Sequence, residues 1–175
     1  MQEPTHILAG VIIQKSAQSV LGRRWFAMVL MAVAAFLSHG LLDRLANMTY
    51  HPPRADFHDP FWVAFHSCVL LTTILFLYIW WRRYAWCIAF AMLPDLDWVF
   101  IHGGATFYRK PYFHNFLHII FDETPPFSKL RVPNNRHNPW ACLWEVGLVL
   151  AMLLLIRYAP WRDDESKPST TSGVA

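Results

Sequence analysis

Residues 62–81 read WVAFHSCVLLTTILFLYIWW and contain no Asp, Glu, Lys or Arg. A helix needs roughly 20 predominantly apolar residues to cross the hydrocarbon core of a bilayer. This stretch therefore predicts a transmembrane helix, and the rest of the chain is interpreted from that starting point.

The composition agrees with a membrane environment. Of the 175 residues, 55% are hydrophobic and only 15% are charged, whereas soluble domains carry about 25% charged residues. A second apolar stretch covers residues 140–159, and residues 25–42 and 84–101 are nearly as apolar. Trp and Tyr side chains gather near the ends of these stretches, as they do at bilayer interfaces: Trp25, Trp62, Trp80, Trp81, Tyr84, Trp140, Tyr158 and Trp161. We expect an integral membrane protein.

The expected fold class is all-α: a polytopic membrane helical bundle of four to five membrane-embedded helices plus a short amphipathic helix near residues 112–121. A first helix is predicted between an N-cap at Thr5 and a stop at Gly22. The pairs at residues 23–24 and 82–83, each Arg-Arg, are interpreted as tight connections between helices. One membrane-embedded domain is expected over residues 1–162, followed by a disordered polar tail at 163–175.

Ionisable side chains recur inside the apolar stretches, where they are costly to bury without partners. His39 and Asp43 are spaced i, i+4 and share a helix face, and His114 and His118 have the same spacing. Asp95 follows Pro94, a residue that breaks or kinks a helix. A set of His and Asp side chains is typical of a metal site, because one cation satisfies several of them at once.

A height argument brings these groups together. If the two Arg pairs mark one membrane face, a rise of ~1.5 Å per residue places His6 roughly 24 Å above it, His39 roughly 22 Å and Asp95 roughly 18 Å. Segments distant in sequence would then deliver imidazoles and carboxylates to one end of the bundle. This argument requires the first helix to pair antiparallel with the second.

The expected metal ligands are therefore His6, His39, Asp43, Asp95, His114 and His118. Asp97 lies about 200° from Asp95 around a regular helix, so it is expected to act as the catalytic base, with an outer-sphere partner or a second-metal ligand as alternatives. Zinc is the expected ion, one or two per chain, because it favours His with carboxylate. Manganese or iron would also suit the donors.

The chain resembles the family of small bacterial membrane proteins known as membrane-bound metal-dependent hydrolases. The resemblance rests on Thr5-His6-Ile-Leu-Ala-Gly10, on Ser38-His39-Gly-Leu-Leu-Asp43 and on Leu93-Pro94-Asp95-Leu-Asp97. It implies His6, His39, Asp43, Asp95 and Asp97 as metal-site residues, a hydrolytic activity and a place in the bacterial cytoplasmic membrane.

The function expected from these features is metal-dependent hydrolysis of a phosphoester or ester in an amphiphilic, lipid-like substrate. Membrane lipid is the expected partner. The alternatives are a non-enzymatic metal- or haem-binding membrane protein, a transporter subunit, and a structural protein with a metal-free polar network. A net charge of +3, dispersed along the chain, argues against nucleic acid. No Ser-His-Asp pattern, Gly-rich phosphate loop or HExxH sequence suggests another mechanism.

Overall fold

The computed structural model describes residues 2–21, 24–52, 56–103, 110–129 and 131–161. Within these ranges the chain is all-helical and contains no strand, which confirms the all-α part of the expected fold class. The predicted polar tail at 163–175 lies outside the described residues, as does the predicted stop at Gly22. The elements are α1 (Glu3–Leu21), α2 (Trp25–Leu45), η1 (Ala46–Met48), α3 (Pro60–Met92), η2 (Leu93–Asp95), α4 (Leu96–His102), α5 (Tyr112–His118), η3 (Ile119–Glu123), η4 (Phe127–Lys129), η5 (Pro139–Ala141) and α6 (Cys142–Tyr158).

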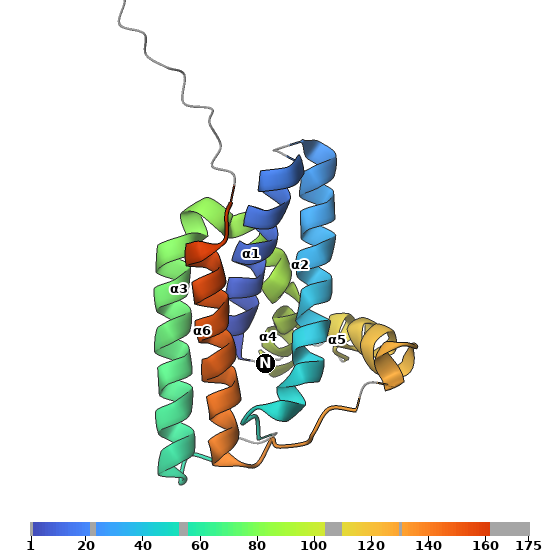
Figure 1. The fold of residues 1–175 in the computed structure, drawn as a ribbon. Helices are drawn as coiled ribbons and strands as arrows, with labels where there is room; N and C mark the ends of the chain where they lie inside the picture. Colours follow the sequence, from blue (N-terminus) through green and yellow to red (C-terminus); the bar gives the residue numbers. More distant parts are fainter. Residues whose placement is uncertain (1, 22–23, 53–55, 104–109, 130, 162–175) are drawn as a thin grey trace, which may run out of the picture.

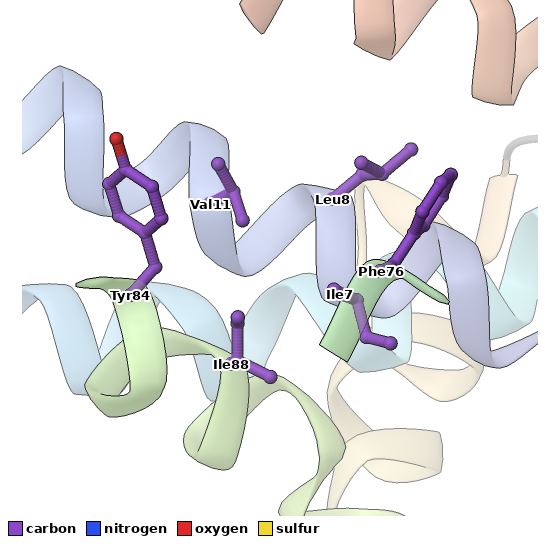
Figure 2. Packing of buried hydrophobic residues seen from close by; sticks show 6 residues of the cluster. All are labelled: Ile7, Leu8, Val11, Phe76, Tyr84 and Ile88. Carbon is purple, nitrogen blue, oxygen red and sulfur yellow. The ribbon is translucent and has the colours of Figure 1, made fainter. Parts of the chain in front are cut away.

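Helix α1 is the central element and packs against α2, α3 and α6 (Figure 1). It begins at Glu3, so Thr5 lies in its first turn and is not the N-cap that the sequence predicted. Figure 2 shows Ile7, Leu8 and Val11 of α1 in the main apolar cluster with Phe76, Tyr84 and Ile88 of α3. Because residues 4–11 are all buried, the start of α1, including His6, is held inside the bundle.

The predicted connection at residues 82–83 lies beside a sharp break within α3, at which the chain reverses direction. Helix α3 is helical from Pro60 to Met92 except at Tyr84, whose φ of −124° and ψ of 19° are not helical. Figure 1 shows α3 turning over at one end of the bundle and running back behind α1 towards α4. The Gln14 side chain donates to the Arg83 carbonyl at 3.2 Å and accepts from the Cys87 amide at 3.3 Å. These bonds satisfy backbone groups near the break, as an apolar environment requires.

Among the residues that the structure describes, three helical segments are long and apolar enough to cross a membrane: Trp25–Met48, Pro60–His102 and Pro139–Tyr158. Their outer faces carry large exposed apolar side chains, which include Val29, Leu30 and Val33 on α2, Leu70, Leu71 and Ile74 on α3, and Leu143, Leu150 and Leu154 on α6. Exposed apolar surface on this scale is typical of a face covered by lipid or by another protein. The structure is thus consistent with a membrane protein, while the expected count of four to five membrane-embedded helices is not confirmed.

Two close helix contacts position the candidate site. A Cβ on Gly10 of α1 would lie 2.9 Å from backbone atoms of Cys87 and Ile88, so α1 and the second half of α3 touch backbone to backbone. A Cβ on Gly40 of α2 would lie 2.6 Å from the Phe121 ring, beyond the end of α5. Glycine permits both approaches. They bring α1, α2, η2 and α5 together at the end of the bundle where α1 begins (Figure 1).

Candidate metal centre

Five of the predicted site residues meet at this end of the bundle. Two overlapping groups have ligand atoms within 4.8 Å of one another. The first contains His6, His39 and Asp43, and the second contains His39, Asp95 and His114. These residues come from α1, α2, η2 and α5, and His39 is common to both groups. The antiparallel pairing of α1 and α2, which the height argument required, is what brings His6 to Asp43.

His39 is the fully buried centre of the cluster. Its Nδ1 lies 2.8 Å from the Ala91 carbonyl oxygen, which can only accept, so Nδ1 carries the hydrogen and donates it. In the neutral ring Nε2 then holds a lone pair. That atom lies 3.1 Å from Asp43 Oδ2 and 3.6 Å from Asp95 Oδ1, yet it has no hydrogen-bond partner among the described residues.

When His39 is neutral, its Nε2 and the two carboxylate oxygens, Asp43 Oδ2 and Asp95 Oδ1, are all acceptors. They face one another with no hydrogen atom between them. Lone pairs at these distances repel one another unless a positive charge lies among them. A proton on Nε2 or a metal ion would supply that charge. The Nδ1 bond to a backbone carbonyl is also the arrangement that fixes a metal-binding histidine, since it sets the tautomer and the ring orientation.

His6 adds a second buried imidazole. Its Nε2 lies 3.4 Å from Asp43 Oδ1, and its ring stacks on that of His39 with centroids 4.0 Å apart and planes at 15°. Two imidazolium rings stacked this closely would repel, so the stack favours at least one neutral ring. Asp43 thus turns one carboxylate oxygen towards each histidine.

Asp95 and Asp97 face different partners, as their helical spacing predicted. Asp95 lies by His39, and its Oδ2 is buried without a hydrogen bond among the described residues. Asp97 is fully buried, and its Oδ2 accepts from the His114 backbone amide at 2.9 Å and from His114 Nδ1 at 3.1 Å. Asp97 therefore orients His114, which matches the outer-sphere alternative. A role for Asp97 as a base stays a prediction.

His114 presents its second ring nitrogen to the cluster. Nε2 lies 3.6 Å from Asp43 Oδ2 and accepts a hydrogen bond from the Trp98 indole at 3.2 Å. This bond confirms that the lone pair is on Nε2, because an indole N–H can only donate. Trp98 must release this lone pair before His114 can bind an ion through it.

The structure does not bring His118 to the cluster. Its side chain is 60% exposed and lies 3.6 Å from both Asp122 and Glu123. The i, i+4 spacing does place His114 and His118 on one face of α5, but only the first turn of α5 is tied to Asp97. His118 lies one turn further along the helix, at the mouth of a cavity described below.

Two polar groups near the cluster have structural partners. Glu145 of α6, buried in the bundle, accepts from the Gln2 amide at 2.8 Å and from the Thr5 hydroxyl at 2.7 Å, which fixes the start of α1. His51, in the segment after η1, lies 3.1 Å from the Gln2 side-chain amide. Burial lowers the pKa of His51 to about 4, so this ring is neutral at pH 7.

Sequence reasoning did not single out Arg44, Arg136 or Trp98. Arg44 directly follows Asp43, and that adjacency was an available signal. Trp98 directly follows Asp97 and offered the same signal, whereas Arg136 reaches the site only through the docking of a distant segment, which no local pattern reveals.

Comparison with protein-family models, with curated proteins and with solved structures finds no match to this chain. The resemblance to the membrane-bound metal-dependent hydrolases accordingly stays a prediction that rests on the motifs quoted above.

Proposed function

We propose that the chain is a membrane-embedded, metal-dependent hydrolase that acts on a phosphoester or ester of an amphiphilic substrate. His6, His39, Asp43, Asp95 and His114 would hold one or two divalent cations, with zinc the first choice. The bacterial cytoplasmic membrane is the proposed location. The observation that carries the proposal is the buried Nε2 of His39, which faces two carboxylates and has no hydrogen-bond partner among the described residues.

The donor set fits such an ion. Three neutral imidazoles and the two carboxylates of Asp43 and Asp95 sum to a charge of −2, which a single divalent cation neutralises. Zinc accepts nitrogen and carboxylate ligands in tetrahedral sites, and manganese and iron accept the same donors. Protonation of His39 alone would leave the His6 ring stacked against the His39 imidazolium. The Nε2 of His6 would still be directed at Asp43.

The chemistry at this site divides between the ion and the protein. A divalent ion held by these residues would supply Lewis acidity, lowering the pKa of a water molecule to about 7 and polarising the substrate. Asp97 holds His114 in one orientation through two hydrogen bonds. Asp95 Oδ2, buried and without a hydrogen bond among the described residues, is placed to take up a proton.

The same geometry speaks against haem. Axial histidines approach a haem iron from opposite faces of the porphyrin, whereas the His6 and His39 rings stack directly on one another at 4.0 Å. A haem between these two rings would also leave Asp43 and Asp95 without partners.

Hydrolysis of a phospholipid panel tests the proposal. Purified protein in detergent is assayed with zinc, after chelation, and after zinc is restored. We expect activity that disappears with chelator and returns with metal, is lost in His39→Ala, and persists in His66→Ala, a histidine on α3 outside both ligand groups. Bound metal without hydrolysis of any lipid would favour the non-enzymatic alternative. Hydrolysis unaffected by chelator would contradict the proposal.

A further inference from the structure

A small cavity adjoins the cluster of His and Asp side chains and, unlike that cluster, is lined by arginines. Its volume is about 170 Å³, and Asp43 and His114 of the cluster form part of its wall. Arg44, Arg136 and Asn47 also line it. Cavities that enclose drug-sized ligands measure roughly 300–1,000 Å³, so this one accommodates a headgroup rather than a whole lipid.

The two guanidinium groups are held in place by the fold. Arg44 belongs to α2 and pairs with Asp122. Arg136 comes from the segment before α6, which is tied to η1 and to the segment after η1 by two backbone bonds. His51 donates to the Arg136 carbonyl at 3.0 Å, and Asn135 donates to the Asn47 carbonyl at 2.7 Å. The Nε of Arg136 is buried and makes no hydrogen bond within the described part of the chain.

We infer that this cavity binds the phosphoryl group of the substrate, with Arg136 and Arg44 as its anchors. The inference rests on the proposed function and narrows it from esters in general to phosphoesters. A carboxylic ester carries no negative charge, and it would leave the buried Nε of Arg136 without an anionic partner. A phosphoryl group offers several anionic oxygens, and the fork of an arginine binds two of them at once.

The charge balance makes this binding depend on metal. Two guanidiniums of the cavity wall are offset by the carboxylates of Asp43 and Asp122, so the metal-free cavity is close to neutral. A divalent cation at the adjoining cluster would neutralise Asp43 and Asp95, which leaves the two guanidiniums and Asp122 with a surplus of one positive charge that favours an anionic phosphoryl group. The metal-loaded protein should therefore bind phosphate much more tightly than the metal-free protein.

The surroundings of the cavity suit an amphiphile. His118, exposed at 60%, lines the cavity and shows that it reaches the surface. Phe116 and Ile119 lie nearby in sequence on the same helical segment and are 53% and 55% exposed. Apolar side chains beside an anion-binding pocket would hold the hydrocarbon part of a lipid outside while its phosphoryl group enters.

Binding measurements on zinc-loaded protein test this inference. Inorganic phosphate and acetate are titrated by calorimetry in detergent, and binding to nanodiscs of phosphatidic acid or phosphatidylcholine is measured in parallel. We expect phosphate to bind and acetate to bind at least tenfold more weakly. Binding of phosphatidic acid nanodiscs alone would identify a lipid headgroup, and binding of inorganic phosphate alone would identify a soluble phosphate. Failure of both would overturn the inference.

Matched arginine variants provide the control. Arg136→Gln should weaken phosphate binding at least tenfold with unchanged zinc content. The phosphate affinity of Arg136→Lys should lie between those of the wild type and Arg136→Gln, because lysine keeps the charge but loses the forked guanidinium. Arg157→Gln, on the exposed end of α6, should bind like the wild type. If Arg136→Gln loses zinc, or binds phosphate normally, the assignment of Arg136 fails. A protein that binds no zinc contradicts the proposed function, whereas one that binds zinc but no phosphate contradicts this inference alone.

Discussion

Substitution of Gly10 by alanine tests the packing that holds the cluster together. The new Cβ would lie 2.9 Å from the carbonyl carbon and oxygen of Cys87 and from the amide nitrogen of Ile88. These are backbone atoms and cannot rotate away, so α1 and α3 must separate. Overpacking of this kind costs about 1–3 kcal/mol, and we expect the upper half of that range. His6 lies one helical turn from Gly10, so its alignment with Asp43 should suffer too.

Gly147→Ala is the matched control, because a Cβ at that position on α6 meets nothing within 4 Å. Both variants gain the same helix propensity, about 1 kcal/mol. The difference between their free energies of unfolding therefore isolates the steric cost. Unfolding of both variants by SDS in mixed micelles measures it, and zinc titration reports the site. Equal stability and equal zinc affinity in the two variants would refute the close backbone contact.

Three further predictions concern the surroundings of the cluster. Gly40→Ala should displace Phe121, which lies 2.6 Å from the new Cβ, and weaken zinc binding in a competition assay; wild-type affinity would argue against that contact. Asp97→Asn should reduce zinc affinity roughly 10–100-fold, because it removes the charge that orients His114; an unchanged dissociation constant would contradict that role. His51 has a folded pKa of about 4, below its ordinary 6.5, so stability should fall as the pH drops from 6.5 towards 4. The unfolding temperature of His51→Gln should fall less steeply than that of the wild type over this pH range. Identical pH profiles for the two proteins would contradict a neutral His51 in the folded protein.

The sequence predicted the helical class and most of the cluster because both depend on local patterns. Uninterrupted apolar stretches predict helices directly, and the i, i+4 spacing of His39 and Asp43 places both side chains on one face. The rise per residue was enough to match the heights of His6 and His39. The separation of Asp95 from Asp97 also followed from helix geometry alone.

Other features depend on packing, which sequence spacing does not encode. The helix break next to the predicted connection is stabilised by Gln14, a residue of a different helix that bonds to backbone groups on both sides of Tyr84. His118 lies one turn after His114 on α5, but the second turn of α5 packs on α2 through Leu117 and leaves the His118 side chain exposed. Arg136 enters the cavity wall because its segment binds η1 and the segment that follows η1, a contact between residues far apart in the chain.

Metal content of the purified protein tests the central claim most directly. Wild-type protein, His39→Ala, Asp95→Asn and the control His66→Ala are loaded with zinc, desalted and analysed by mass spectrometry for metal per chain. We predict one or two zinc ions in the wild type and in His66→Ala, and a loss of several-fold in His39→Ala and Asp95→Asn. A wild-type protein without metal, or equal metal in all four proteins, would contradict the account.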